Sequence, residues 1–379
     1  MTRPSLLFRN GRIFDGTRLL DGHVAAFRDG CLTALVPERE APQAEEVVDL
    51  AGDILSPGYV DLQVNGGDGL MLNDAPDVAT LTRIAQAHRR LGCRWILPTL
   101  ITDTPDKTRT TIEAAKTAIR QGVDGIAGLH LEGPHLSVTR KGAHDATLIR
   151  PMEPEDLTAL CDAARALPAL MVTIAPESVT PEQVNTLTQA GAAVSLGHTD
   201  ADFDICTAHI AAGARCATHL FNAMSQLGNR EPGLVGAALS SGQLSCGLIA
   251  DGIHVHPQSM RAAFAAKIGP GGIFLVSDAM AVAGTELGEF HLEGRLIRRE
   301  AGRLTLEDGT LAGADLDLTQ ALNVLVNRVG IPLDQALAAA TTLPGRLIGL
   351  DVALAPASAN RIADVIRISP DLRHCAPAI

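Results

Sequence analysis

Four residues able to bind a metal or carry a proton each stand directly after a short apolar run. They are Glu132, His198, His219 and Asp278, and the runs before them cover residues 125–131, 192–197, 214–218 and 272–277. Short runs of apolar and small residues bounded by Gly or Pro are typical of buried strands. If these strands are parallel neighbours, the four side chains meet at one edge of a sheet, where they can hold a metal, activate a water and move its proton.

The types of these residues indicate a catalytic metal site. Two neutral imidazoles and one carboxylate suit a divalent ion that keeps open positions for water and substrate. A single His or Glu after a strand is commonly structural, but three of them at three strand ends predict that Glu132, His198 and His219 bind one metal. Residues 279–284, which follow Asp278, look like a loop rather than a helix. We therefore interpret Asp278 as the group that moves the proton of the water, and not as a helix N-cap.

The chain around these residues alternates between strand-like and helix-like segments. Amphipathic segments that begin near Pro or Asp and end near Gly predict helices over residues 77–91, 104–121, 154–167, 181–190, 202–212, 257–268, 316–329 and 332–341. Such alternation indicates a parallel sheet closed as a (β/α)₈ TIM-like barrel, whose active site forms at the carboxyl ends of the strands.

The two chain ends predict a second, smaller unit. Short strands, separated by turn dipeptides such as Asn10-Gly11, are expected over residues 6–9, 12–14, 22–28, 31–36 and 46–50. Residues 361–368 are strand-like and are placed in the same unit, whereas residues 370–379 are expected to be a loose end. The predicted division is a small β-sandwich domain of residues 1–53 plus 350–379 and a barrel of residues 54–349, with a hairpin insertion within residues 286–309.

Composition narrows the classes of partner. A net charge of −12 and an aromatic content of 3% argue against nucleic-acid binding, and the same charge argues against binding to anionic membranes. No apolar run approaches the roughly 18 residues of a membrane-spanning helix, and the N-terminus lacks the apolar core of a signal peptide. The seven Cys are scattered without a CxxC pair, which is typical of reduced thiols. We expect a cytoplasmic protein with a small-molecule substrate.

Several sequence blocks around these residues resemble one enzyme family. Over nearly its whole length the chain is similar to the N-acetylglucosamine-6-phosphate deacetylase family of the amidohydrolase superfamily. The matching blocks are HLEGPH (130–135), KGAH (141–144), GHTDA (197–201), THLFNAM (218–224), REPGLVGAAL (230–239), ADGIHV (250–255), SDAM (277–280) and LAGA (311–314). The resemblance implies that Glu132, His198 and His219 are the metal ligands and that Asp278 is the catalytic acid/base.

The resemblance also implies a substrate-binding set. Arg230 stands in a Gly-rich loop, which suits a phosphate, although an ion pair with Glu231 is the alternative. His144 and His254 follow the same strand-end pattern. His144 is a candidate to polarise the acetamide carbonyl and His254 a candidate for the sugar or phosphate, but the sequence leaves their roles open. The implied set is completed by Ala143, Asn222, Ala223, Asp251, Leu311, Ala312, Gly313 and Ala314.

One departure from the wider superfamily concerns the number of metals. Most amidohydrolases carry His-x-His after the first barrel strand, whereas this chain has Gln63 and Asn65 there. Neutral amides are poor ligands for a transition metal. We therefore predict one divalent ion per chain and, at Gln63 and Asn65, the remnant of a second site. Zinc is favoured, with iron, manganese and cobalt left open.

The predicted reaction is the metal-dependent hydrolysis of N-acetyl-D-glucosamine 6-phosphate to D-glucosamine 6-phosphate and acetate, in amino-sugar catabolism or cell-wall recycling. The resemblance also implies a homodimer in which an Arg of one subunit completes the other's site. The alternatives are another amidohydrolase acting on N-acyl amino acids or cyclic amides, an iron oxygenase with the same ligand types, and a metal-free scaffold relative. The KGAH, FNAM and REPG blocks argue against the first, the strand–helix alternation against the second, and the four intact chemical positions against the third.

Overall fold

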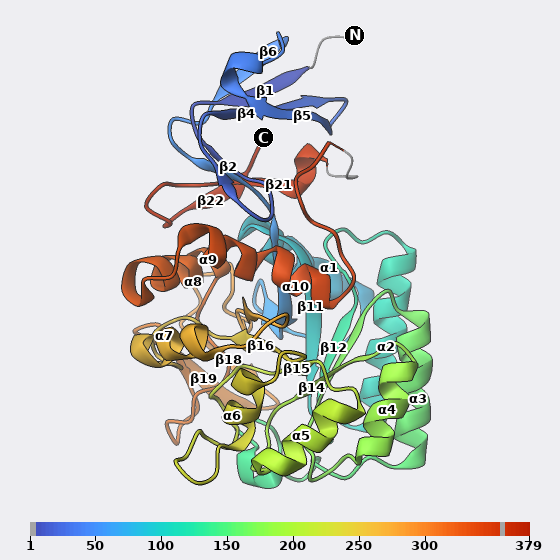
Figure 1. Cartoon of the computed structure of the whole chain (residues 1–379). Coiled ribbons are helices and arrows are strands. Elements are labelled where there is room, and N and C mark those ends of the chain that lie inside the picture. Colours follow the sequence, from blue (N-terminus) through green and yellow to red (C-terminus); the bar gives the residue numbers. More distant parts are fainter. Residues whose placement is uncertain (1–4, 357–360) are drawn as a thin grey trace.

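A (β/α)₈ barrel forms the centre of the computed structural model, which describes residues 5–356 and 361–379 (Figure 1). Its eight strands are parallel and neighbour one another in chain order. They are β8 (Tyr59–Val64), β11 (Cys93–Ile101), β12 (Leu129–Glu132), β13 (Leu170–Ile174), β14 (Ala193–Leu196), β15 (Cys216–Ala217), β16 (Ser245–Leu248) and β17 (Ile273–Leu275). The first strand, β8, and the segment after the last strand, β17, are also joined by backbone hydrogen bonds. The N–H of Asn65 donates to the carbonyl of Ala279 at 2.9 Å, and the N–H of Asp278 donates to the carbonyl of Gln63 at 3.1 Å. The predicted barrel is confirmed.

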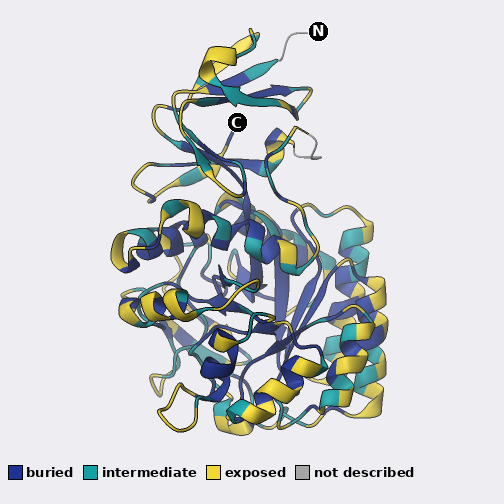
Figure 2. Ribbon diagram, viewed as in Figure 1, coloured by how far each residue is buried: buried dark blue, intermediate teal, exposed yellow. Residues whose placement is uncertain are grey.

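Helices surround the barrel and turn their apolar faces to it, as the exposed outer and buried inner surfaces in Figure 2 show. Five of them, α1, α2, α4, α5 and α8, begin after an Asp or Thr whose side chain accepts the N–H three residues on, which satisfies a free amide of the first turn. The helices are α1 (Val78–Arg90), α2 (Pro105–Arg120), α3 (Pro154–Ala166), α4 (Pro181–Gln189), α5 (Phe203–Ala212), α6 (Gly233–Ser240), α7 (Pro257–Ala266), α8 (Leu318–Val324), α9 (Leu333–Ala340) and α10 (Thr342–Leu347).

The eight predicted helical segments match eight of these helices to within a few residues, and a π-helical turn at Leu325–Val329 extends α8. The prediction lacked α6 and α10. All residues of α6 except Ser240 are buried, so the segment has no polar face to create a helical period. α10 contains a Pro and a Gly, which normally indicate a turn.

Two small sheets bring the chain ends together above the barrel (Figure 1). β21 pairs with β7 and β22 pairs with β21, so the expectation that residues 370–379 form a loose end is wrong. β7 belongs to the same five-stranded sheet as β21 and β22, although it begins just past residue 53, where the barrel was predicted to start. The exact domain boundaries remain a prediction. The strands are β1 (Leu6–Arg9), β2 (Arg12–Phe14), β3 (Leu19–Leu20), β4 (His23–Arg28), β5 (Cys31–Pro37), β6 (Glu46–Asp49), β7 (Ile54–Pro57), β21 (Val365–Ile368) and β22 (Cys375–Pro377).

The predicted insertion is a three-stranded antiparallel sheet of β18 (Glu289–Leu292), β19 (Arg295–Glu300) and β20 (Arg303–Thr305). It lies beside a short hairpin of β9 (Gly66–Gly67) and β10 (Leu70–Met71), and one buried cluster contains apolar residues from both, such as Met71 and Leu292. Single 3₁₀ turns occur at Glu38–Glu40, Val138–Arg140 and Ile362–Asp364. Among the described residues, no helix is long and apolar enough to cross a membrane.

Candidate active site at the mouth of the barrel

Three metal-ligating side chains converge at the carboxyl ends of adjacent strands. Glu132 is the last residue of β12, and His198 and His219 lie two residues beyond β14 and β15. All three are buried, and Oε1 of Glu132 lies 3.4 Å from Nε2 of His198 and 3.3 Å from Nε2 of His219, while the two nitrogens are 3.0 Å apart. Ligands of a tetrahedral ion at about 2.0–2.1 Å have about this spacing. The predicted ligands are therefore arranged for one divalent ion.

The surroundings of the two His residues fit this role. Nδ1 of His198 is 2.8 Å from the backbone carbonyl of Arg140, which places the proton on Nδ1 and leaves the Nε2 lone pair for a metal. Burial alone would raise the pKa of Glu132, but the contacts with His198 and His219 outweigh it and hold that pKa well below its usual range. Burial likewise opposes protonation of His219, but its contact with Glu132 raises the pKa of that imidazole. The carboxylate is thus ionised and able to accept a cation.

The turns that present these side chains have an unusual backbone. His198, His219 and Asp278 have φ values of 47°, 29° and 51°, in the left-handed region that non-glycine residues rarely adopt, and Ala223 has 46°. Each such residue costs about 1–3 kcal/mol unless its surroundings hold it in place. Strained residues at three of the strand ends therefore support a functional role for this mouth.

Asp278 is held by the two amides that replace the usual His pair. Its Oδ1 accepts hydrogen bonds from Nε2 of Gln63 at 3.1 Å and from Nδ2 of Asn65 at 2.8 Å, and Gln63 also donates to Oε1 of Glu132 at 3.0 Å. In the described part of the chain no side chain donates to Oδ2 of Asp278, which leaves it for a reacting group. Burial and the charge of Glu132 raise the pKa of Asp278 to about 6. That value suits a group that must accept and then return a proton near neutral pH.

His144 is oriented to donate a hydrogen bond into the site. The backbone N–H of Thr102 donates to Nδ1 of His144 at 3.3 Å, so the proton of this imidazole is on Nε2, which lies 3.9 Å from Oε2 of Glu132. Burial and the neighbouring His198 keep the pKa of His144 well below its usual range, so the ring is neutral. Sequence reasoning missed Thr102, although it directly follows β11, where the strand-end pattern could have found it.

A cavity of about 380 Å³ opens beside these groups. Of the predicted substrate residues, it is lined by Ala143, His144, Asn222, Ala223, His254, Leu311 and Gly313, together with Asn65 of the amide pair. Ala312 and Ala314 are buried and do not line it. The N–H of Ala314 instead donates to the backbone carbonyl of Asp278 at 2.9 Å. This segment therefore both lines the cavity and holds the backbone of Asp278.

Asp251 and Arg230 lie outside this cavity. The carboxylate of Asp251 is engaged by His254, whose Nδ1 is 2.5 Å from Oδ2, and by the backbone N–H groups of Ile253 and His254 at 2.8 Å. Asp251 therefore orients His254, which does line the cavity. Arg230 is exposed in the loop before α6 and does not contact the site of its own chain.

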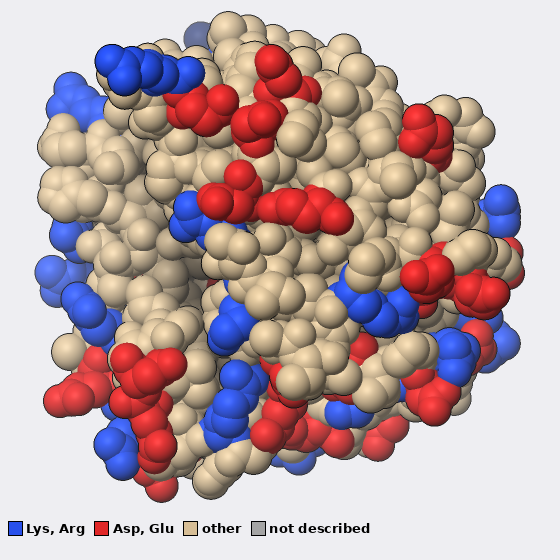
Figure 3. All heavy atoms as spheres, turned by 90° about the horizontal axis from the view of Figure 1, so that it is seen from below, with Lys and Arg blue, Asp and Glu red and all other residues tan. Residues whose placement is uncertain are grey.

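One Arg that was not predicted does line the cavity. Among the described residues Arg140 is the only Lys or Arg in its lining, and its guanidinium pairs with Asp200 at 2.7 Å. Figure 3 shows Lys and Arg interspersed with Asp and Glu on the face seen from below. An anionic ligand here would thus meet individual cations rather than a broad basic surface.

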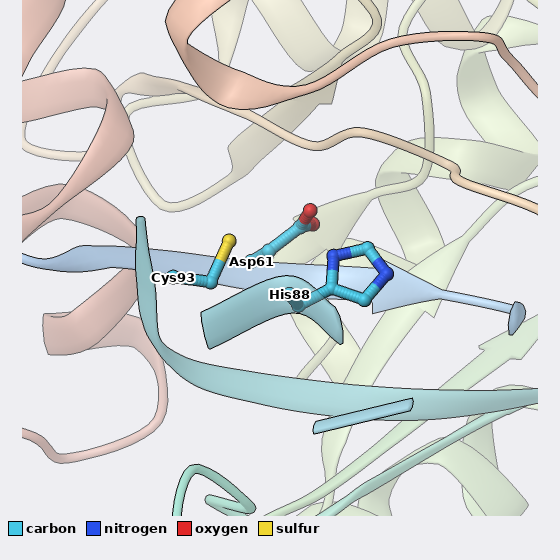
Figure 4. Close-up of side chains that lie close together, drawn as sticks. All are labelled: Asp61, His88 and Cys93. Carbon is cyan, nitrogen blue, oxygen red and sulfur yellow. The ribbon is translucent and has the colours of Figure 1, made fainter. Parts of the chain in front are cut away.

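A second buried group, Asp61, His88 and Cys93, also combines metal-ligating types (Figure 4). Two of its members are engaged by the backbone: Asp61 accepts from the N–H of Ser277 at 3.2 Å, and Nε2 of His88 is 2.9 Å from the carbonyl of Gly66. Burial raises the pKa of Asp61 to about 7, lowers that of His88 to about 4 and raises that of Cys93 well above its usual range. These hydrogen bonds link β8 to the segment after β17 and α1 to β9, which is a structural role.

Comparisons with known proteins show what this chain is similar to. Residues 54–371 match the profile of the Amidohydrolase family. The chain is 42% identical to the N-acetylgalactosamine-6-phosphate deacetylase of Shewanella sp. strain ANA-3, over 79% of this chain and 75% of that relative. It is 33% identical to the N-acetylglucosamine-6-phosphate deacetylase of Haemophilus influenzae, over 90% of this chain and 89% of that relative. The crystal structure of N-acetylglucosamine-6-phosphate deacetylase from Pasteurella multocida is similar with a TM-score of 0.90 and 31% identity, over 97% of this chain and 96% of that one.

Proposed function

This chain belongs to the amidohydrolase family, and we propose that it removes the acetyl group of N-acetyl-D-glucosamine 6-phosphate, giving D-glucosamine 6-phosphate and acetate. The observation that carries the proposal is the convergence on one cavity of a metal-ligating trio, a neutral N–H donor and a carboxyl group with one free oxygen. The relatives named for amino-sugar phosphate deacetylation support the substrate class.

The residues divide the chemistry among them. A divalent ion held by Glu132, His198 and His219 would polarise the acetyl oxygen and lower the pKa of a water. Asp278 takes one proton from the attacking water through Oδ2, and the Nε2–H of His144 donates to the oxygen that gains charge as the C–O bond to the water forms. When the C–N bond breaks, its electron pair stays on nitrogen, which receives the proton from Asp278. The acetic acid formed loses its proton to solvent.

One metal per chain is the stoichiometry that this site supports. Gln63 and Asn65 direct N–H groups at Glu132 and Asp278, so the faces that would bind a second cation already carry partial positive charge. Two imidazoles and a carboxylate suit zinc, and iron, manganese and cobalt can use the same ligands.

The phosphate is expected at the outer end of the cavity. Asn222, Ala223 and His254 line that cavity, but Arg230 lies on an exposed loop of its own chain. We place Arg230 in the site of a second subunit of a homodimer, where an exposed guanidinium can reach a phosphate. The scattered free thiols support a cytoplasmic location.

N-acetyl-D-galactosamine 6-phosphate is the second candidate substrate. Two relatives, at 42% and 31% identity, carry that activity in their names, and the two sugars differ only in the configuration of one hydroxyl group. The hydrolytic machinery acts at the N-acetyl group and is the same for both.

Acetate release from both sugar phosphates and from unphosphorylated N-acetylglucosamine tests the proposal. We expect turnover of at least one sugar phosphate, loss of turnover with a chelator, and recovery when a divalent metal is restored. N-acyl amino acids and cyclic amides provide the controls for the rival amidohydrolase reactions. Turnover of one of those controls with neither sugar phosphate used would overturn it.

A further inference from the structure

One oxygen in the site has no hydrogen-bond partner. The side chain of Asn65 is 1% exposed and lines the cavity, and its Nδ2 donates to Oδ1 of Asp278 at 2.8 Å. Its Oδ1 is buried, and no described residue donates to it. Buried carbonyl oxygens are nearly always paired in proteins. We therefore expect a ligand bound in the cavity to donate a hydrogen bond to this oxygen.

The direction of this oxygen is fixed by its surroundings. An ionised carboxylate can only accept hydrogen bonds, so the amide of Asn65 must turn its NH₂ group to Asp278 and its oxygen away. The backbone on either side is also held, because the N–H of Asn65 donates to Ala279 at 2.9 Å and its carbonyl accepts from Leu72 at 3.0 Å. Oδ1 of Asn65 is thus a pre-positioned acceptor next to the catalytic acid/base.

The donor must be a group that comes close to Asp278. In the proposed reaction Asp278 delivers its proton to the amide nitrogen, so that nitrogen must lie within hydrogen-bond distance of Oδ2. A nitrogen that contacts both oxygens can bridge a gap of up to about 6 Å, the sum of two hydrogen bonds. Asn65 is hydrogen-bonded directly to Asp278 at 2.8 Å and lines the same cavity, so a nitrogen bound beside Asp278 also lies beside Asn65.

We infer that Oδ1 of Asn65 accepts the hydrogen bond of the scissile N–H group, an inference that rests on the proposed deacetylation. When water adds to the acetyl carbon, the nitrogen becomes pyramidal, and its lone pair, no longer delocalised into the carbonyl, is localised on it. With its N–H held by Asn65, that lone pair is turned toward Asp278. The C–N bond then breaks, its electron pair stays on nitrogen, and the proton of Asp278 is transferred to it while Asn65 retains the original N–H.

This role explains why amides occupy the positions of the missing second metal site. Gln63 and Asn65 both donate to Oδ1 of Asp278, but of the two only Asn65 lines the cavity, and its buried Oδ1 has no partner among the described residues. A cation at this place would repel an N–H donor, whereas a carbonyl oxygen attracts it. Asn65 is therefore a substrate-positioning residue and not only a remnant.

The test compares an amide with an ester that lacks the N–H. kcat/KM is measured for the N-acetyl sugar phosphate and for its 2-O-acetyl analogue, glucose 6-phosphate acetylated at O2, in wild type, Asn65→Ala and Gln63→Ala. The Gln63→Ala variant is the control, because it removes the donor to Asp278 and Glu132 without touching the acceptor, and a change in those contacts affects amide and ester alike. We expect Asn65→Ala to lose about tenfold more on the amide than on the ester, the scale of one buried hydrogen bond. The amide-to-ester ratio should change much less in Gln63→Ala.

A binding measurement separates positioning from chemistry. By calorimetry, Asn65→Ala should weaken glucosamine 6-phosphate, which keeps N–H donors at C2, about tenfold, and should leave 2-deoxyglucose 6-phosphate, which has no donor there, nearly unchanged. Melting temperature and metal content verify that the variants are folded and loaded, and Asn65→Ser replaces the Ala variant if that one does not fold.

The outcomes are distinct for the two proposals. Equal losses on amide and ester, or on the two binding ligands, would show that Oδ1 of Asn65 meets another group, such as the attacking water, and would overturn the inference while wild-type turnover upholds the deacetylase. A wild-type protein that releases no acetate from either sugar phosphate would overturn the proposed function, and the inference with it.

Discussion

Two buried groups in this barrel combine an acid with His, but only one is arranged for chemistry. In the first, Glu132, His198 and His219 place their ligand atoms 3.0–3.4 Å apart, beside a cavity of about 380 Å³. In the second, Asp61, His88 and Cys93 also lie close together, but Asp61 and His88 are hydrogen-bonded to backbone groups. Burial alone cannot explain the difference, because all six side chains are buried.

The two groups differ in whether their buried polar atoms already have hydrogen-bond partners. Around the first group, Nδ1 of His219 and Oδ1 of Asn65 are buried and have no hydrogen-bond partner among the described residues, and the two His residues and Asp278 have left-handed backbone. In the second, the carboxylate of Asp61 accepts the backbone N–H of Gln63 within β8 and that of Ser277, which links β8 to the segment after β17. A catalytic site is thus identified by unsatisfied and strained groups beside a cavity, and a structural cluster by side chains whose hydrogen bonds are made with the backbone.

Removing a ligand from each group gives the largest expected contrast. His198→Ala should lower bound metal from about one equivalent per chain to below about a tenth, and should reduce kcat/KM more than about 10³-fold, since Lewis-acid catalysis supplies several kcal/mol. Cys93→Ser should leave metal content and activity near wild type. Metal analysis and acetate release measure both. A stable second equivalent that disappears in Cys93→Ser would show that the second group also binds an ion.

Replacing Asp278 while leaving the metal ligands in place tests the proton-transfer role of the first group separately from its metal binding. Asp278→Asn keeps the size of the side chain and loses the proton acceptor, so we expect kcat to fall at least about 10²-fold, the usual scale for a positioned acid/base. Folding and metal content should stay near wild type, as melting curves and metal analysis can verify. A variant that keeps more than a tenth of wild-type kcat would remove Asp278 from the mechanism.

Arg230→Ala tests whether the substrate phosphate in the cavity is bound by the Arg230 guanidinium of a second subunit. A charge-assisted contact with phosphate contributes roughly 1.5–3 kcal/mol, which corresponds to about one to two decades in kcat/KM. The loss should be much smaller for unphosphorylated N-acetylglucosamine, because that sugar offers no charge to Arg230. Equal losses for the two sugars would mean that Arg230 has a structural role and that the phosphate is bound elsewhere, for example near Arg140.

The sequence predicted the parts of this site that follow from strand periodicity. Apolar runs that end at Glu132, His198, His219 and Asp278 placed these residues at strand ends, and parallel pairing brings them together. The same pattern could have shown that Thr102 follows β11. The barrel itself followed from the alternation of strands and helices.

Other features depend on tertiary contacts that periodicity does not encode. The sequence identified Gln63 and Asn65 as missing ligands, but their hydrogen bonds to Asp278 depend on how the first and last strands meet. Asp251 was predicted to bind substrate, yet its carboxylate is engaged by His254 and by backbone N–H groups. Hydrogen-bond direction at the end of a strand is decided by left-handed turns and by neighbouring loops, which leave no repeating signal in the chain.

The smallest expected effect concerns the proton of Asp61 in the second group. Burial raises the pKa of Asp61 to about 7 in the folded protein, whereas an Asp in an unfolded chain has a pKa of about 3.9. Between these values the folded state binds the extra proton. Its contribution to the free energy of unfolding is therefore full below about pH 4 and is lost as the pH rises through 7, with a slope of at most about 1.4 kcal/mol per pH unit.

Denaturation of wild type and Asp61→Asn at several pH values isolates this contribution. We expect the free energy of unfolding of wild type, relative to the variant, to fall by about 1–3 kcal/mol between pH 5 and pH 8. Cys93→Ser is the matched control, because its thiol stays protonated over this range and its replacement should leave the slope unchanged. If wild type and Asp61→Asn instead run parallel, Asp61 is ionised in the folded protein. The second group would then carry a buried negative charge, and a cation would have to balance it.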